Sequence, residues 1–333
     1  MPNRIGAMIA FTLALVAQDH AMAQSPETSG LKLEAKIPLG NVSGRIDHMA
    51  IDLARQRLFV AELGNNSVGI VDLNGHKVIR TLDGLKEPQG VAYLPPTDTV
   101  YVANAGDGSV RLFRGPDYTS AGQIDLGDDA DNIRLDIPAN RIVVGYGSGG
   151  LAVIDAASSK KVADIPLNVH PEGFQLDPGS SRIWVNLPKT QAIAVVDRQS
   201  GRQTATWPMQ TAGGNFPMVL DQTARRVLVA FRNPAKLGAF STDDGSVIAS
   251  PDICGDADDL FVDAKRHRVY ISCGEGFIDV LDSAERSYRR VARIATVSGA
   301  RTSLFVPEMD RLMLAVRASG GEPAAIWVFQ PMP

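Results

Sequence analysis

Polar side chains with metal-binding, acid–base or anion-binding chemistry recur just before short apolar runs of this chain, about 42 residues apart. Carboxylate and amide oxygens are the ligands that Ca²⁺ and Mg²⁺ prefer, and an imidazole can act as a general base. An arginine guanidinium offers a rigid fork to a carboxylate or a phosphate. The candidate ligand-binding residues are His48, Asn132, His170, Glu172, Asn215, Asp258 and Arg301, together with Arg232, which follows a later run. Four of them form a candidate set for a divalent cation: Glu172, Asn132, Asn215 and Asp258.

These residues owe their spacing to a unit that repeats seven times. The first apolar residues of the units are Met49, Val91, Ile133, Phe174, Met218, Leu260 and Leu304, with successive spacings of 42, 42, 41, 44, 42 and 44 residues. This is the period of a four-stranded propeller blade. In each unit a polar turn separates the first run from a second and a third run follows, and in the first six units a fourth strand comes after it. The pattern predicts an all-β, seven-bladed β-propeller of antiparallel blades, whose first strands bring the candidate residues to one channel mouth.

The seventh unit lacks a fourth strand, because the chain ends at Pro333 soon after the third run. Leu31–Leu39 (LKLEAKIPL), followed by GNVSGRIDHM, resembles the fourth run of another unit, Lys161–Leu167 (KVADIPL), followed by NVHPEGF. We therefore expect the N-terminal strand to complete the last blade and so remove a pair of open sheet edges.

An aspartate and an arginine flank the first turn of five units and could be mistaken for a catalytic set. The pairs are Asp52 and Arg57, Asp136 and Arg141, Asp177 and Arg182, Asp221 and Arg226, and Asp263 and Arg268. An aspartate at the head of a turn accepts hydrogen bonds from the backbone just beyond it. Because the pattern repeats at one hairpin after another, we interpret it as turn structure. No Ser/His/Asp nucleophile or phosphate loop is present, and no residue is singled out as catalytic.

Tyr101-Val102-Ala103-Asn104, followed by GDGSV, resembles the YVTN family of β-propeller repeats, and the similar units around it extend the likeness over residues 24–333. The resemblance implies an exported protein of bacterial or archaeal type with a propeller fold. The family's relatives include surface-layer proteins and enzyme-like propellers, so the fold alone does not assign an activity.

Three functions compete for the channel mouth. The first, which we favour, is binding or scaffolding, with a small molecule or a protein as partner at this face. The second is a metal-dependent hydrolase of the lactonase kind, with Ca²⁺ or another divalent cation in the channel and His48 or His170 as general base. The third is a haem-linked or redox role, which ranks last because no Cys-x-x-Cys-His sequence is present.

The start of the chain predicts export. A basic residue, Arg4, precedes an apolar stretch, and Ala21-Met22-Ala23 has the pattern of a cleavage site, so residues 1–23 are interpreted as a secretory signal peptide and residues 24–333 as one domain. No later stretch predicts a membrane span, and we expect a monomer that is periplasmic or secreted. The net charge is −4 and no basic run occurs, which argues against nucleic acid as a partner.

The chain has two cysteines, Cys254 and Cys273. Cys254 comes just before a first strand, and Cys273 ends its hairpin partner. Antiparallel pairing brings these two points to the same end of the sheet. Export makes a disulfide permissible, so we expect a structural bridge between them.

Overall fold

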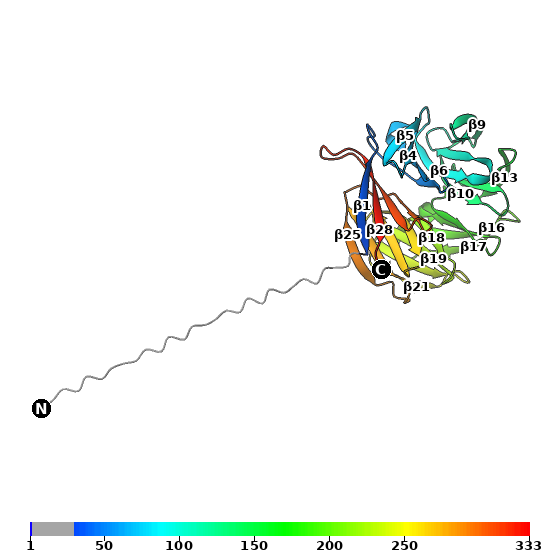
Figure 1. Ribbon diagram of the computed structural model, residues 1–333. Helices are drawn as coiled ribbons and strands as arrows, with labels where there is room; N and C mark the ends of the chain where they lie inside the picture. The colour runs from blue at the N-terminus through cyan, green and yellow to red at the C-terminus, as the bar shows by residue number, and fades with distance from the viewer. Residues whose placement is uncertain (2–29) are drawn as a thin grey trace.

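Seven four-stranded antiparallel sheets surround a central axis in the computed structural model, which describes Met1 and residues 30–333 (Figure 1). The predicted seven-bladed propeller is therefore confirmed. The predicted signal peptide, apart from Met1, lies outside the described residues. None of the helices that the structure describes is long and apolar enough to cross a membrane.

Each blade is built from four strands, which in blades 1 to 6 are consecutive in the chain. Blade 1 contains β2 (Met49–Asp52), β3 (Arg57–Glu62), β4 (Ser67–Asp72) and β5 (Lys77–Leu82). Blade 2 contains β6 (Pro88–Leu94), β7 (Thr99–Asn104), β8 (Ser109–Arg114) and β9 (Thr119–Asp125). Blade 3 contains β10 (Ala130–Asp136), β11 (Arg141–Tyr146), β12 (Gly150–Asp155) and β13 (Lys160–Pro166). Blade 4 contains β14 (Phe174–Leu176), β15 (Arg182–Leu187), β16 (Ala192–Asp197) and β17 (Arg202–Pro208).

The remaining blades follow the same plan. Blade 5 contains β18 (Gly213–Asp221), β19 (Arg226–Asn233), β20 (Ala235–Ser241) and β21 (Val247–Ala249). Blade 6 contains β22 (Ala257–Asp263), β23 (Arg268–Cys273), β24 (Phe277–Asp282) and β25 (Arg290–Ala295). Blade 7 contains β26 (Ser303–Val306), β27 (Arg311–Val316), β28 (Ala325–Pro331) and β1 (Leu31–Pro38). Three short 3₁₀ turns lie between strands, at η1 (Leu63–Asn65), η2 (Pro95–Thr97) and η3 (Pro188–Thr190).

The N-terminal strand completes the last blade, as the sequence predicts. β1 pairs antiparallel with β28, from Leu31 opposite Pro331 to Pro38 opposite Ala325 (Figure 1). The strand buries Leu31 and Ile37 while most of its other side chains stay exposed. The two ends of the described chain therefore stabilise the same sheet and close the ring.

The hydrophobic core is divided among the interfaces between neighbouring blades. Seven clusters of buried apolar side chains are present in the described chain, and each draws its members from two adjacent blades. The second and third strands supply most of these residues, many of them β-branched, which suits packing on a pleated surface. Because each face of a blade meets its neighbour, the core holds the ring together and leaves the axis to polar side chains.

The recurrent aspartates stabilise turns. Asp52 accepts the Arg55 backbone N–H at 3.2 Å, Asp221 that of Ala224 at 2.9 Å, and Asp263 that of Lys265 at 3.0 Å. This confirms the turn interpretation for these positions.

Two arginines within the turns also join neighbouring blades. Arg55 binds both Asp52 and Asp98 of the next blade, and Arg266 binds both Asp263 and Asp310 in the same way. The turns therefore contribute to the contacts between blades as well as to the hairpins.

The predicted disulfide is confirmed. Cys254 and Cys273 are bonded, with their Cα atoms 5.8 Å apart. The bridge joins Cys254, three residues before β22, to the end of β23, and both cysteines lie in the buried cluster between blades 5 and 6.

Candidate functional site

A cavity of about 830 Å³ lies on the axis of the ring, and all seven blades line it. Its walls are the first strands and the segments that lead into them. Seven of the eight ligand-binding candidates line it: His48, Asn132, His170, Glu172, Arg232, Asp258 and Arg301. The cavity falls within the range of volumes that small-molecule sites have, and charged groups dominate its mouth.

Asn215 is the exception. Its side chain is fully buried and donates hydrogen bonds to Asn186 Oδ1 at 3.2 Å and to the Ala192 carbonyl at 3.0 Å. These contacts hold it in the interface between blades 4 and 5, and it is not among the residues that line the cavity. The structure therefore does not bring Asn215 to the other proposed cation ligands.

Irregularities in the first strands direct several of these side chains into the cavity. In blades 2, 3, 5 and 6 the first strand carries one residue more than its partner across a register shift, for example between Ala130 and Ile133 of β10 and between Ala257 and Asp259 of β22. A bulge of this kind bends the strand and turns side chains out of the regular alternation. Asp131, Asn132 and Asp258 lie in these irregular stretches. The strands also begin three to five residues earlier than the periodicity predicts, because regular alternation cannot anticipate a bulge.

Glycines allow the first strands of neighbouring blades to approach closely at this level. A Cβ atom on Gly90 would lie 2.1 Å from the Asp131 carbonyl oxygen, and one on Gly173 would lie 2.5 Å from the Phe216 carbonyl oxygen. The Gly173 N–H donates to that Phe216 oxygen at 3.0 Å. Backbone contact between blades therefore fixes the segments that carry Asp131 and Glu172.

An acidic cluster with one histidine occupies the wall formed by blades 3 and 4. One ligand atom from each of Asp131, His170 and Glu172 lies within 4.8 Å of the others. The His170 Nε2 atom is 4.0 Å from Asp131 Oδ2, and its Nδ1 atom lies 2.7 Å from the Gly147 carbonyl oxygen. A carbonyl can only accept, so Nδ1 carries the proton of this hydrogen bond and Nε2 faces the cavity.

The surroundings of this cluster favour bound protons. Burial raises the pKa of the Glu172 carboxyl to about 8, and the negative charge of Asp131 adds to the rise. Burial alone would lower the pKa of His170, but Asp131, the Gly147 carbonyl and Asp129 together raise it to about 9. At neutral pH Glu172 is therefore mainly neutral and His170 mainly cationic.

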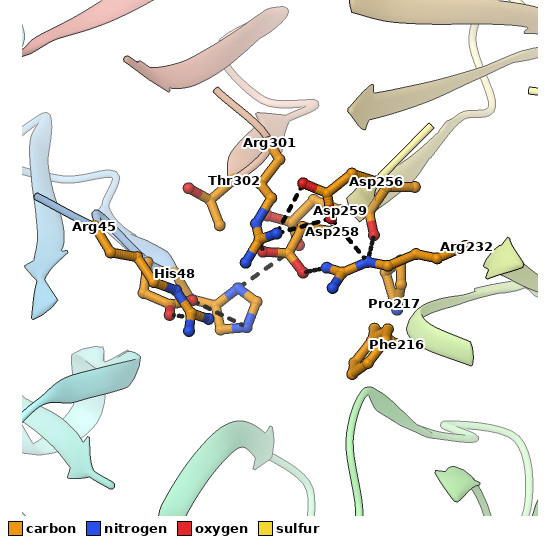
Figure 2. A network of polar contacts seen from close by, with 12 residues as sticks. Arg45, His48, Phe216, Pro217, Arg232, Asp256, Asp258, Asp259, Arg301 and Thr302 are labelled. Carbon is orange, nitrogen blue, oxygen red and sulfur yellow. Dashed lines mark hydrogen bonds and ion pairs between the residues drawn. The ribbon is translucent and has the colours of Figure 1, made fainter. Parts of the chain in front are cut away.

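The opposite wall is a network of paired charges (Figure 2). Arg301 Nη1 lies 2.8 Å from both oxygens of Asp256, and its Nε lies 2.9 Å from Asp258 Oδ2. Arg232 of blade 5 reaches the same two carboxylates from the other side and also donates to the Ala257 carbonyl at 2.9 Å. Arg232 stacks over the Phe216 ring, 4.1 Å from its centroid. Both arginines are therefore already engaged with carboxylates of blade 6.

His48 connects blade 1 to this network. Its Nε2 atom lies 3.7 Å from Asp47 Oδ1 and its Nδ1 atom 3.7 Å from Asp259 Oδ1 (Figure 2). Burial opposes the charge on the ring, but Asp259 and then Asp47 raise the pKa of His48 to about 10. The ring is therefore an imidazolium between two carboxylates, a state in which it cannot accept a proton as a general base.

Arg134 is a charged channel residue that sequence reasoning missed. It lies in β10 and lines the cavity, where it donates to the Ile133 carbonyl at 2.8 Å and lies over the Phe174 ring. Within residues 30–333 it forms no ion pair with a carboxylate, and burial lowers its pKa. A signal was available in the sequence, because Arg134 is the one charged residue among those that directly follow the first apolar residue of each repeat unit. The corresponding residues of the other units are Ala50, Ala92, Gln175, Val219, Phe261 and Phe305.

Fold and cavity together define a seven-bladed β-propeller with a charged site on its axis, a fold that is consistent with a binding or scaffold role. Comparison with solved structures finds hydrazine synthase from Kuenenia stuttgartiensis, with a TM-score of 0.72 and 17% sequence identity, covering 87% of this chain and 97% of that chain. At this identity the likeness shows the fold alone. No protein-family model matches the chain, and no curated protein matches it. The YVTN resemblance therefore stays a prediction.

Proposed function

We propose that this protein binds a small anionic molecule in the cavity on the propeller axis, with the Arg134 guanidinium as the anion-binding group. The single observation that carries the proposal is an arginine in the channel wall with no carboxylate partner among the described residues. Withdrawing a guanidinium from bulk water is costly unless a counter-charge compensates it. A carboxylate or a phosphate in the cavity would supply that charge and would match the donor fork.

Most of the other charged side chains that line the cavity support this choice, because they already lie in ion pairs. Asp258 has Arg232 and Arg301, Asp47 has Arg45, Asp259 has His48, and Asp131 has His170; the contacts of these pairs are 4.0 Å or shorter. Among the described residues Arg134 has no such pair, and Lys189, which also has none, is exposed at the rim of the cavity. The sequence suggests Arg45, Arg232, Arg301 and Arg317 as anion-binding groups. Arg45 would first have to leave Asp47, and Arg232 and Arg301 would have to leave Asp256 and Asp258. Arg317 is not among the residues that line the cavity.

The cavity also limits the size and the character of the ligand. Its volume of about 830 Å³ would accommodate a metabolite-sized molecule rather than a folded partner. Apolar residues of the first strands, such as Ile133 and Leu260, also line the cavity. A ligand with one anionic group and a compact, partly apolar body would fit this arrangement.

The compartment belongs to the same proposal. A structural disulfide is typical of proteins that fold in an oxidising environment. Together with the predicted signal peptide and the resemblance to YVTN repeats, it supports a periplasmic or secreted binding protein.

Calorimetric titration with inorganic phosphate and with malonate tests anion binding. Losing a hydrogen bond to a charged group costs about 1.5–3 kcal/mol, so Arg134→Gln should weaken the tighter-binding anion about 10- to 100-fold. Lys189→Gln is the matched control, because Lys189 also lines the cavity but is exposed at its rim. It should change the affinity less than about threefold, since an exposed charge interacts weakly through water.

Arg134→Lys tests the bidentate donor geometry of the guanidinium separately from its charge. It also provides a second test if the Arg134→Gln variant does not fold. We expect intermediate affinity, because lysine keeps the charge but cannot bind a carboxylate in bidentate fashion. The proposal is wrong if wild-type protein binds neither anion at millimolar concentration, or if a folded Arg134→Gln variant binds as tightly as wild type.

A further inference from the structure

The cluster of Asp131, His170 and Glu172 has the composition of a metal site. It presents two carboxylates and one imidazole from two neighbouring blades, with one ligand atom of each within 4.8 Å of the others. Such a set can surround one ion after a small contraction, because metal–ligand bonds to nitrogen and oxygen are about 2.0–2.2 Å long. The spacing alone does not establish a site, since carboxylates also cluster without binding an ion.

A second, independent observation concerns Asp131. Asp131 is only 5% exposed, and its Oδ1 atom is buried with no hydrogen-bond partner among the described residues. A buried carboxylate oxygen without a donor is costly, and structures rarely leave one in that state. The side chain faces the cavity beside His170 and Glu172. A cation bound by the cluster would satisfy this oxygen.

The orientation of His170 points the same way. Because Nδ1 donates to the Gly147 carbonyl at 2.7 Å, the ring is held with Nε2 toward the two carboxylates. Histidines that bind metals commonly donate their other ring N–H to a carbonyl or a carboxylate, which fixes the tautomer and the ring plane. The backbone of blade 3 thus orients the His170 ring so that Nε2 lies toward the two carboxylates. Because Nε2 carries a proton at neutral pH, a metal ion would displace that proton on binding.

We infer that Asp131, His170 and Glu172 bind a divalent first-row transition-metal ion such as Mn²⁺ or Zn²⁺. The imidazole decides the class of metal, since nitrogen ligands suit these ions, whereas Ca²⁺ and Mg²⁺ prefer an all-oxygen set. The proposed set shares only Glu172 with the cation ligands that the sequence suggested. Asp258 is bound instead by Arg232 and Arg301, and Asn215 lies outside the cavity lining.

The inference goes beyond anion binding and does not rest on it. Arg134 is close enough to Asp131 for their charges to interact, so a metal ion at the cluster would add positive charge to the same region of the cavity. Metal and anion binding would then favour one another. Each can still be measured alone, because the metal ligands and the proposed anion-binding group are different residues.

Titration with Mn²⁺ alone and with Zn²⁺ alone, as chloride salts in a buffer without phosphate or carboxylate anions at pH 8, tests the site. Electron paramagnetic resonance reports bound Mn²⁺, and calorimetry reports Zn²⁺. Wild-type protein should bind one ion of at least one of these metals more tightly than Ca²⁺. Asp131→Asn and His170→Gln should each weaken that binding at least tenfold, since each removes one ligand of three.

Two control variants distinguish metal binding at this cluster from metal binding to exposed carboxylates of the rim and from anion binding at Arg134. Asp128→Asn removes a carboxylate that is exposed at the rim of the same cavity and should leave metal affinity within about threefold of wild type. Arg134→Gln should retain the metal even if it abolishes anion binding. The inference is overturned if Ca²⁺ binds best or if no ion binds. It is also overturned if Asp131→Asn and His170→Gln are both folded and bind the metal like wild type.

Discussion

The disulfide offers a prediction whose magnitude follows from its place in the chain. Cys254 and Cys273 are 19 residues apart and both are buried. Cross-linking a loop of this length removes conformational entropy from the unfolded chain, and the chain-entropy relation gives a stabilisation of about 3 kcal/mol at 25 °C. Protein refolded under reducing conditions should therefore be less stable than oxidised protein by about this amount.

The measurement is urea unfolding at equilibrium, followed in parallel for oxidised protein and for protein kept reduced throughout. The dependence of the unfolding free energy on urea should also become steeper after reduction, because the unfolded chain is no longer held compact and exposes more surface. Reduction is preferable to substitution as the main perturbation, since replacing two buried sulfurs by alanine would add a cavity cost to the loss of the bond.

Two results would refute this reasoning. Thiol titration of unreduced, denatured protein should find no free cysteine, and two reactive thiols would contradict the bridge itself. Equal stability of the oxidised and reduced forms, within about 0.5 kcal/mol, would show that the bridge does not restrain the unfolded chain. A Cys254→Ala, Cys273→Ala double variant provides the control, because reducing agent should leave its stability unchanged.

Two further predictions concern the ring closure and the channel. Ile37→Ala in β1 should lower the free energy of unfolding in urea by about 2–5 kcal/mol, because Ile37 is buried between blades 7 and 1. Lys32→Ala on the exposed side of β1 should change it by less than about 0.5 kcal/mol. Equal effects of the two substitutions would contradict the closing role of β1. The pKa of His48 is raised from 6.5 to about 10, so the folded protein retains a proton that the unfolded chain loses above pH 6.5. The stability that protonated His48 contributes is fully present below pH 6.5 and is lost as the pH rises through 10, by up to about 1.4 kcal/mol per pH unit. The unfolding free energy of His48→Gln should therefore decline less steeply than that of wild type between pH 6.5 and 10. Parallel curves for the two proteins would contradict the raised pKa of His48.

The repeat period was sufficient to predict the architecture. Seven first strands at spacings of 41 to 44 residues and the likeness of Leu31–Leu39 to a fourth strand led to the ring and its closure, both of which the structure confirms. The pairing of Cys254 with Cys273 followed from the same strand order. These features depend on local patterns that repeat along the chain, and each repeat reinforces the interpretation of the others.

The cavity was located correctly as a region, but not in its detail. Alignment of the residues that precede the first strands placed His48, Glu172 and Asp258 around one channel, and the structure brings all three to the cavity. Alignment could not show that Asn215 turns into the sheet toward Asn186, because a bulge changes which side of a strand a residue faces.

The pairing of charges across blades was decided by the tertiary structure alone. From the sequence, Arg134, Arg232 and Arg301 are equivalent cations, and Asp131 and Asp258 are equivalent carboxylates. Closure of the ring brings Arg232 and Arg301 together on Asp258, and it leaves Arg134 without an ion pair and Asp131 Oδ1 without a donor among the described residues. The repeat period and the alternation of apolar and polar residues can be seen along the chain alone, and they were enough to predict the fold. Which charges lie within 4 Å of one another depends on the bulges and on the contacts between blades, so the chemistry of the channel follows only from the folded ring.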